Sequence, residues 1–439
     1  MLQVIELFFV TLHPKMTTKL YHIICEWLRD LIQGTPWEGH VFAVGGCCRD
    51  EMMGFEIKDL DLAVDLPNGG VRFARWLQKR RLTTGRPVFF LKYGTAKLRL
   101  RRFPDDEIEL VQTRKEQYTK ETSRCPEVAF GTIEEDCYRR DFTVNSLYYD
   151  LTNRRMVDIT GKGVSDMQAG RLRTPMDPDE TFNDDPVRIL RGLRFANRFG
   201  WKLDREVFEA MMRHIDRLTI VSRERVHSEL CKMLNGPDPV GIMNTLRETG
   251  ALAIMIPELG EMVRNRVAWG DAMERLGRLI AADPEAPTRY RLATIFIGLA
   301  PKAQEASRLA RAVMTTLRFD RPIVSDVAFL VRFVGVDNEV LDNWRQVRAI
   351  QNLASIPRRL DFLCGFMADM GRADEAARLR RESQQLVREG RSGFAPTERE
   401  AEGTQPVAEE PRKRHRRGGR RRGRGKRPSG SRRRPGKES

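Results

Sequence analysis

The chain has 439 residues, of which 41% are hydrophobic and 31% are charged, and its formal net charge is +16 at pH 7. This length is typical of two or three domains, each with enough apolar residues for its own core. No stretch reaches the roughly 18 consecutive apolar residues of a membrane-spanning helix, so we expect a soluble protein with no membrane partner.

The positive charge is concentrated at the C-terminal end. Residues 411–439 hold 15 Lys and Arg against one Glu, so they contribute +14 of the net charge of +16 and leave +2 for the rest. A basic tail rich in Gly and Arg is expected to contact RNA nonspecifically through its phosphates. A solubilising extension with no specific partner is the alternative.

Seven cysteines are scattered along the chain without a C-x-x-C pair. This usage predicts free thiols in a reducing, cytoplasmic compartment. The opening residues 1–15 are briefly apolar but lack the basic start and the cleavage site of a secretion signal. We expect either a helix there or a true start at Met16.

The first 160 residues alternate between helical and strand patterns. Apolar residues at helical spacing predict helices over 17–33 and 71–80. Short apolar or alternating runs predict strands, which cover residues 40–44, 58–64, 87–102, 107–114, 142–150 and 155–160. Residues 17–160 are therefore expected to form a first domain in which helices pack on a sheet.

From residue 184 onward the periodicity is helical up to about residue 389. We divide this part into residues 161–260 and residues 261–389. Residues 390–439 are poor in apolar side chains and are expected to form a disordered linker and an Arg-rich tail. The predicted fold class is α+β, with a mixed sheet first and helices after it.

Two acids in the first domain, Asp59 and Asp61, are candidate metal ligands. Side chains two residues apart on a strand share a face, so these carboxylates are expected to lie together. Two close anions favour a cation between them, and hard ions such as Mg²⁺ prefer carboxylate and phosphate oxygens. The alternative is that the two acids are the solvated face of an edge strand.

The glycines Gly45 and Gly46 strengthen the metal hypothesis, because they follow a predicted strand and precede a predicted helix. Without a Cβ in the way, their backbone can approach a triphosphate. Arg49, one helical turn later, adds a charged fork for the same anion. Between them, Cys47 and Cys48 lack further metal ligands and are expected to pack in the core.

Five segments occur in an order that resembles the class II tRNA nucleotidyltransferases, the CCA-adding enzymes that are grouped with bacterial poly(A) polymerases. They are "GGCCRD…DLDLAV", "RRDFTVNSLYYD", "DITGKGVSDM", "DDPVRILRGLRFANRFG" and "SRERVHSEL". The resemblance covers roughly residues 40–260. It implies a polymerase-β-like nucleotidyltransferase head over 17–160, a helical neck that binds nucleotide and RNA over 161–260, and a helical body and tail over 261–389.

The resemblance also implies roles for individual residues. Asp59 and Asp61 resemble the catalytic, metal-binding pair, and Gly46 and Arg49 resemble triphosphate contacts. Arg140 matches a nucleotide-contacting arginine, and Asp141 resembles the residue associated with the sugar. Asn145 is expected to hold the strand. Taken alone, residues 139–141 would be interpreted as a surface charge cluster, and only the neighbouring motifs favour a functional role.

The segment from Asp184 to Arg194 is expected to choose the base. Asp185, Arg188, Arg191 and Arg194 recur every three residues, so all four can fall on one helical face. A carboxylate and a guanidinium suit the polar edge of cytosine or adenine, and the later arginines can reach phosphates. The resemblance implies the same role, although this chain has Asp184 where bacterial members often have Glu.

Three further expectations concern other residues. Glu109 is a candidate third acidic ligand, with pairing to Arg114 or simple exposure as the alternative. Ser222 is a predicted N-cap of a helix that buttresses the neck. Many relatives carry a metal-dependent phosphohydrolase module with a His-Asp pair, but no His-Asp dipeptide occurs here, so we expect a degenerate module without phosphohydrolase activity.

The resemblance implies addition of CMP and AMP, from CTP and ATP, to the 3′ end of tRNA, with Mg²⁺ as cofactor and release of pyrophosphate. Addition of only CC or only A stays open. A poly(A) polymerase acting on RNA 3′ ends is one alternative function. A catalytically silent RNA-binding protein is another, and the presence of all the site residues disfavours it.

Overall fold

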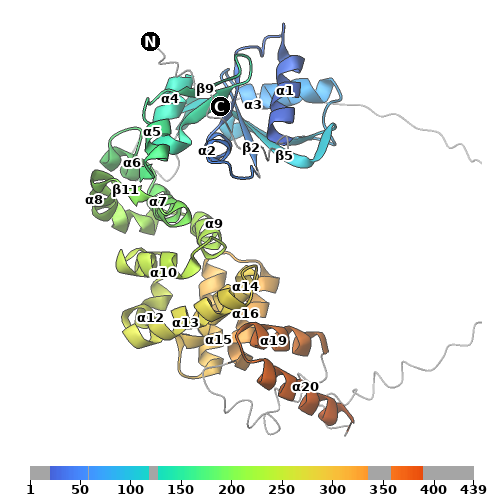
Figure 1. Cartoon of the computed structure of the whole chain (residues 1–439), viewed down its shortest axis with the longest axis vertical. Helices are drawn as coiled ribbons and strands as arrows, with labels where there is room; N and C mark the ends of the chain where they lie inside the picture. The colour runs from blue at the N-terminus through green and yellow to red at the C-terminus, as the bar shows by residue number, and fades with distance from the viewer. Residues whose placement is uncertain (1–19, 58, 118–126, 335–356, 389–439) are drawn as a thin grey trace, which may run out of the picture. The chain divides into compact units, whose positions relative to one another are not determined.

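The computed structural model describes residues 20–57, 59–117, 127–334 and 357–388 (Figure 1). The predictions for residues 1–15, for the linker from 390 and for the tail 411–439 lie outside the described residues. Within the described part, no helix combines the length and the apolar character that crossing a bilayer requires.

A seven-stranded mixed sheet forms the centre of the first domain, in the order β3-β4-β5-β2-β1-β8-β9. The strands are β1 (Val41–Val44), β2 (Leu60–Val64), β3 (Val88–Phe90), β4 (Thr95–Leu100), β5 (Phe103–Gln112), β8 (Leu147–Asp150) and β9 (Arg155–Asp158). β2 pairs parallel with β5 and antiparallel with β1. Because β2 is the middle strand, the edge-strand alternative for the two acids is wrong.

The alternation of side chains along β2 decides where the acids point. Leu60, Leu62 and Val64 enter an apolar core with α1 (Leu20–Ile32) and α3 (Gly69–Lys79). Ala63 packs on the opposite face with Phe42 and Tyr148. Since neighbouring residues of a strand point to opposite faces, Asp61 lies on the face of Ala63, away from α1 and α3.

Cys47 and Cys48 are buried in the same core, as predicted. They lie in α2 (Gly46–Met52), a short helix that Gly45 separates from β1. Their thiols donate to the backbone oxygens of Val44 and Ala43, each at 3.3 Å. The six described cysteines are all free, which agrees with the predicted free thiols.

The sequence patterns missed several short elements of the head. A hairpin of β6 (Arg114–Gln117) and β7 (Glu127–Phe130) follows the sheet, and α4 (Ile133–Tyr138) comes next. Thr132 and Glu135 form a reciprocal capping box at the start of α4. Three residues predicted as strand, Thr143–Asn145, form the 3₁₀ helix η2 instead.

The remainder is helical, as predicted. The connecting segment contains α5 (Gly163–Gln168), α6 (Pro178–Asp184) and α7 (Val187–Phe199), and β10 (Arg171–Leu172) pairs with β11 (Lys202–Leu203). The later helices are α8 (Arg205–His214), α9 (Arg223–Leu234), α10 (Pro239–Glu248), α11 (Ala251–Met255), α12 (Gly260–Arg264), α13 (Arg266–Ala282), α14 (Thr288–Phe296), α15 (Ala303–Thr316), α16 (Arg321–Val334), α19 (Pro357–Asp369) and α20 (Ala373–Arg388).

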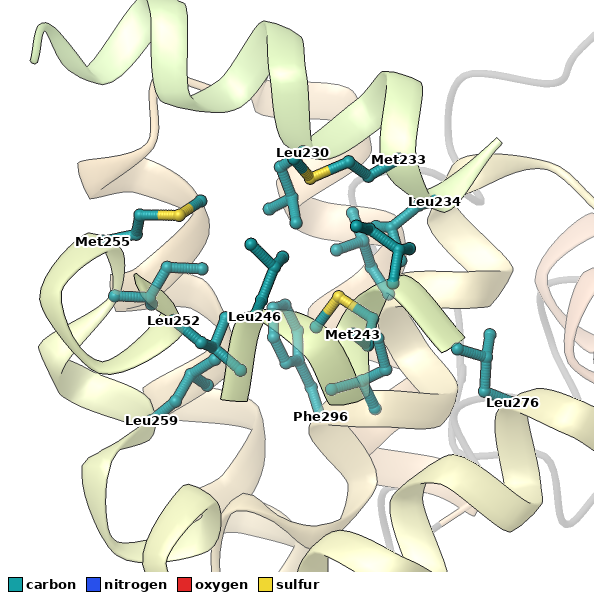
Figure 2. Packing of buried hydrophobic residues seen from close by; sticks show 14 of the residues in the cluster. Leu230, Met233, Leu234, Met243, Leu246, Leu252, Met255, Leu259, Leu276 and Phe296 are labelled. Carbon is teal, nitrogen blue, oxygen red and sulfur yellow. The ribbon is translucent and has the colours of Figure 1, made fainter. Parts of the chain in front are cut away.

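One apolar cluster joins these helices. Figure 2 shows Leu230, Leu246 and Phe296, from α9, α10 and α14, among its members. All three side chains are at most 2% exposed. This packing fixes α9 among its neighbours, and α9 also contacts α7. The domain boundaries at 160 and 260 stay predictions.

One helical expectation was wrong. Asp185 does not share a helix with the arginines that follow it, because α6 ends at Asp184 and Asp185 is extended, with φ −142° and ψ 93°. The cause is Pro186, whose ring disfavours helical geometry in the preceding residue. α7 then begins at Val187.

Candidate active site

Eight of the predicted site residues line one cavity of about 730 Å³. They come from α2, the start of β2, the segment after α4, and α7: Gly46, Arg49, Asp59, Asp61, Arg140, Asp141, Arg191 and Arg194. Asp185, Arg188 and Glu109 do not line it. The structure thus brings together the predicted metal pair and the predicted phosphate contacts.

The acidic side of the cavity is formed where β2 begins. Asp59 immediately precedes β2 and is exposed, and Asp61 is the second residue of the strand and is partly buried. Burial and the nearby charges of Glu109 and Asp59 raise the pKa of the Asp61 carboxyl to about 6, although Arg140 acts against this. A carboxylate that is destabilised by other anions is well suited to accept a cation.

Glu109 lies next to this pair on the sheet. It is the register partner of Asp61 on one side and of Lys97 on the other. Its carboxylate lies 3.1 Å from the ammonium of Lys97. Among the residues that the structure describes, no three His, Cys, Asp or Glu side chains are placed to hold a metal ion. The hard oxygens of Asp59 and Asp61 fit a divalent cation, and their role as its ligands stays a prediction.

The glycine turn fits closely under the cavity. Gly45 has a φ of 78°, in the region that favours glycine. A Cβ on Gly45 would come within 3.3 Å of the guanidinium of Arg140. A larger residue would therefore disturb both the backbone and a predicted nucleotide contact.

A continuous polar network connects α2 to α7 beneath the cavity. Arg49 pairs with Asp50 at 2.6 Å and donates to the amide oxygen of Asn145. The amide nitrogen of Asn145 donates to Asp141 at 3.0 Å, and Asp141 pairs with Arg191 at 2.6 Å. Asn145 thus links two charged groups, a more specific role than the predicted support of a strand.

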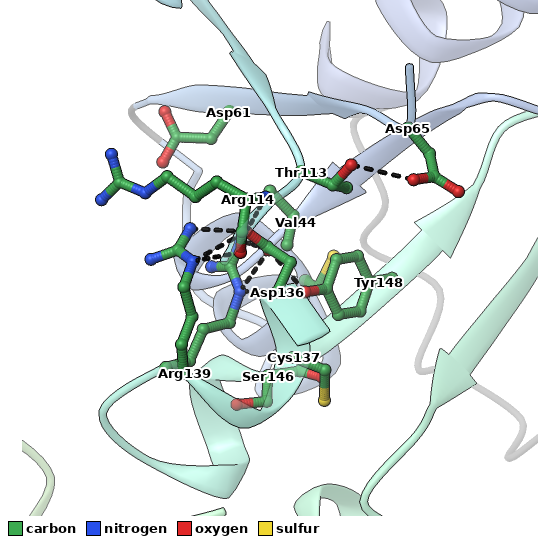
Figure 3. Close-up of polar contacts among 12 residues, drawn as sticks. Val44, Asp61, Asp65, Thr113, Arg114, Asp136, Cys137, Arg139, Ser146 and Tyr148 are labelled. Carbon is green, nitrogen blue, oxygen red and sulfur yellow. Dashed lines mark hydrogen bonds and ion pairs between the residues drawn. The ribbon is translucent and has the colours of Figure 1, made fainter. Parts of the chain in front are cut away.

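A second network holds Arg140. Asp136 is fully buried, and its carboxylate accepts from Arg140 at 2.7 Å and from the hydroxyl of Tyr148 at 2.7 Å. Figure 3 shows Asp136 between Arg139 and Tyr148. Burial alone would raise the pKa of Asp136, but Arg140 and Arg139 hold it far below its usual range. Because Asp136 and Asp141 are both buried, residues 139–141 are not a surface charge cluster.

Two aromatic rings of α7 contact arginines, one from α7 itself and one from α2. The guanidinium of Arg194 lies 4.3 Å from the ring centre of Phe195, and that of Arg49 lies 4.9 Å from Phe199. The rings of Phe195 and Phe199 are stacked on each other. Cation–π contacts of this kind orient a guanidinium while leaving its charge in place.

Asp185 and Arg188 are engaged elsewhere. Asp185 forms a two-bond ion pair with Arg225 of α9, at 2.6 and 2.9 Å. Arg188 is 8% exposed and donates to the backbone oxygens of Thr181 and Arg139. The proposed base reading by these two residues stays a prediction.

The predicted N-cap of α9 is present. Ser222 caps α9 by accepting from the backbone N–H of Arg225. Further along α9, Glu229 pairs with Arg194 at 2.6 Å. The segment therefore contacts α7, and its support of the neck stays a prediction.

Sequence reasoning missed several residues of the cavity, among them Arg198, Lys232 and Asn235. Arg198 lies four residues after Arg194, on the same side of α7, and could have been found from helical spacing. Lys232 and Asn235 stand at the end of α9, and only the packing of α9 on α7 brings them to the cavity.

Comparison with known proteins covers most of the described chain. Residues 41–173 match the family model "Poly A polymerase head domain", and residues 200–262 match "Probable RNA and SrmB- binding site of polymerase A". The CC-adding tRNA nucleotidyltransferase of Thermus thermophilus is 30% identical over 321 residues, which are 66% of this chain and 67% of that protein.

The mitochondrial CCA tRNA nucleotidyltransferase of Saccharomyces cerevisiae is 34% identical over 260 residues, 53% of this chain and 46% of that protein. The chain thus spans less than half the length of this and similar fungal relatives. Among solved structures, the Bacillus stearothermophilus CCA-adding enzyme in complex with CTP aligns with a TM-score of 0.57 and 21% identity. That alignment covers 79% of this chain and 78% of that one, and it confirms the predicted fold.

Proposed function

The chain belongs to the family of tRNA nucleotidyltransferases and poly(A) polymerases, and from this premise we propose that it is a CCA tRNA nucleotidyltransferase. In the proposed reaction, CMP and AMP from CTP and ATP are added to the 3′ end of tRNA without a nucleic-acid template, and pyrophosphate leaves. The observation that carries the proposal is one cavity that joins Asp59 and Asp61, at the start of β2, to six cationic side chains.

Nucleotidyltransferases of this family generally use divalent metal ions. For this chain we propose Mg²⁺, with Asp59 and Asp61 as its ligands. When bound, such an ion activates the attacking 3′-hydroxyl and neutralises charge on the leaving phosphates. Glu109 stays a candidate third ligand, and it would have to exchange the ammonium of Lys97 for the ion.

We assign the other predicted residues of the cavity to the triphosphate and the sugar of the nucleotide. Gly46 lets the backbone approach the triphosphate, and Arg140, held by Asp136, presents its guanidinium to it. Arg49 is 3% exposed, so it acts on the phosphates mainly through its charge. Asp141 is assigned to the sugar. Its neighbours on α7, Arg191 and Arg194, are assigned to the phosphates.

Base choice is proposed for Asp185 and Arg188. In the present geometry Arg225 holds the carboxylate of Asp185. Asp185 must leave this partner before it can accept a hydrogen bond from a cytosine or adenine amino group. An exposed ion pair is worth only about 0.2–1 kcal/mol, so a bound base can replace it.

Addition of CC alone is the second candidate, because the relative matched over 67% of its length is named a CC-adding enzyme. Poly(A) synthesis is the third, because the head matches a model described as a poly(A) polymerase. One experiment distinguishes these three candidate functions. The protein is incubated with tRNA lacking its 3′ end, CTP and ATP are supplied singly and together, and the products are sequenced.

Addition that stops after C-C-A supports the proposal. Addition that stops after C-C, or long runs of A, supports the second or third candidate. No addition with any nucleotide, from a protein that still binds RNA, supports the catalytically silent alternative and refutes the proposal.

Three smaller proposals accompany the function. The cytoplasm is proposed as the compartment on account of the free cysteines. The tail 411–439 is proposed to contact RNA nonspecifically, and its deletion should flatten the salt dependence of RNA binding. Absence of phosphohydrolase activity is proposed from the missing His-Asp dipeptide, and metal-dependent phosphatase turnover would contradict it.

A further inference from the structure

Two cations of the cavity have no role in the proposed function so far. Arg198 stands one residue before the end of α7, and Lys232 stands two residues before the end of α9. Both side chains line the cavity that contains Asp59 and Asp61. The ends of two packed helices therefore form a cationic wall that is separate from the residues assigned to the triphosphate.

Exposure distinguishes these two cations from the others. The side chains of Arg198 and Lys232 are 41% and 51% exposed. The four other cations of the cavity range from 4% for Arg49 to 33% for Arg191. A group that must meet a large polyanion arriving from solvent has to be accessible, and these two are the most accessible.

The ion pairs also distinguish Arg198 and Lys232 from the other cations of the cavity. Asp50 is shared by Arg49 at 2.6 Å and Arg198 at 3.6 Å. Glu229 is likewise shared by Arg194, at 2.6 Å, and Lys232, at 3.0 Å. In each trio one carboxylate faces two cations, and the buried arginine takes the closer contact. One positive charge per trio is left over, and it sits on the exposed member.

Transfer at Asp59 and Asp61 needs two phosphate-bearing substrates, the triphosphate and the RNA end. We propose that Arg198 and Lys232 form a subsite for the phosphodiester next to the 3′-terminal nucleotide of the RNA primer, which directs its hydroxyl toward the two acids. This inference rests on the proposed function. The shared chemistry is phosphate binding, and the test separates the RNA backbone from the triphosphate as its source.

The test uses the full chain with Arg198→Ala, Lys232→Ala and the double variant. In the transfer assay with tRNA lacking its 3′ end, we expect each single change to raise the KM for tRNA about 5- to 10-fold. The KM for CTP should stay within about twofold, because the triphosphate keeps its own contacts. In equilibrium binding without nucleotide, each change should lower the slope of log affinity against log salt by about 0.7–0.9.

Matched controls exclude general effects. Arg205→Ala removes a cation that is 89% exposed on α8 and outside the cavity, so it should leave both KM values unchanged. Arg198→Lys and Lys232→Arg keep the charge and should restore most of the tRNA affinity. Since all these side chains reach solvent, the variants are expected to fold.

The outcomes separate this inference from the proposed function. A raised KM for CTP with an unchanged KM for tRNA would assign the two cations to the triphosphate and overturn the subsite. Unchanged values for both substrates would overturn it as well. If the wild-type chain transfers no nucleotide, the proposed function fails, and RNA affinity with its salt slope still decides: a double variant that binds like the wild type refutes the subsite.

Discussion

Replacing Asp61 with asparagine should make the metal-free protein more stable while it abolishes nucleotidyl transfer. The pKa of this carboxyl is about 6 in the folded chain, against roughly 3.9 in an unfolded one. The folded state therefore holds the proton more tightly, and ionisation of Asp61 destabilises it. The difference corresponds to about 3 kcal/mol, which the neutral amide avoids.

Because the pKa of Asp61 is raised in the folded state, the stabilisation by Asp61→Asn depends on pH in a defined way. Below about pH 4 the carboxyl is protonated in both states and the substitution gains nothing. The gain grows between about pH 4 and pH 6 and is complete above pH 6. Urea unfolding followed by circular dichroism, with EDTA present, measures it at pH 4 and pH 8. Millimolar Mg²⁺ should stabilise the wild type at pH 8 and so reduce the difference in the free energy of unfolding between the wild type and Asp61→Asn.

Asp59→Asn is the matched control. It should abolish transfer equally, but its carboxylate is exposed, so the free energy of unfolding should change little. If Asp61→Asn is no more stable than the wild type at pH 8 in EDTA, burial of the charged Asp61 carboxylate near Glu109 does not carry the expected cost. Equal gains at pH 4 and pH 8 would show that the effect is not electrostatic.

Three further substitutions test the surroundings of the cavity. Gly45→Ala should cost about 1–2 kcal/mol in urea unfolding and raise the KM for CTP, whereas Gly54→Ala, with a φ of 74° and open space around it, should lose stability without any change in KM. Asp136→Asn leaves two arginines without their buried anion, so unfolding should become easier by about 3–5 kcal/mol, and an unchanged value would contradict that ion-pair cluster. Arg225→Ala frees Asp185, so the KM for CTP should fall by up to about fivefold, and a rise would argue against base reading by this carboxylate.

The sequence was sufficient for the parts of the site that lie close together along the chain. The acid pair at the start of β2, the glycines at the start of α2 and the arginines Arg191 and Arg194 of α7 each follow from local spacing, and the structure places them around one cavity. The burial of Cys47 and Cys48 follows from the apolar strand before them and the helix they join. Family resemblance supplied the roles that spacing alone could not.

Other features depend on contacts between distant segments, so no local pattern contained them. Only the strand order shows that Asp61 lies on the central strand beside Glu109. Lys232 reaches the cavity because α9 packs on α7. The position of Asp185 is a different case, because Pro186 follows it directly and a proline rule would have removed it from the helix.

The arginines of α7 have a structural role beside their proposed role in binding substrate, and this affects how their mutants are interpreted. Arg191 pairs with Asp141, and Arg188 donates to the backbone oxygen of Arg139, so both attach α7 to the head. Loss of activity after Arg188→Ala would therefore not establish base reading, because a displaced α7 disturbs every substrate alike. A base-reading residue must change the ratio of kcat/KM for CTP and ATP, whereas a structural one lowers both values by the same factor. That ratio, and not the loss of activity, decides which role Arg188 has.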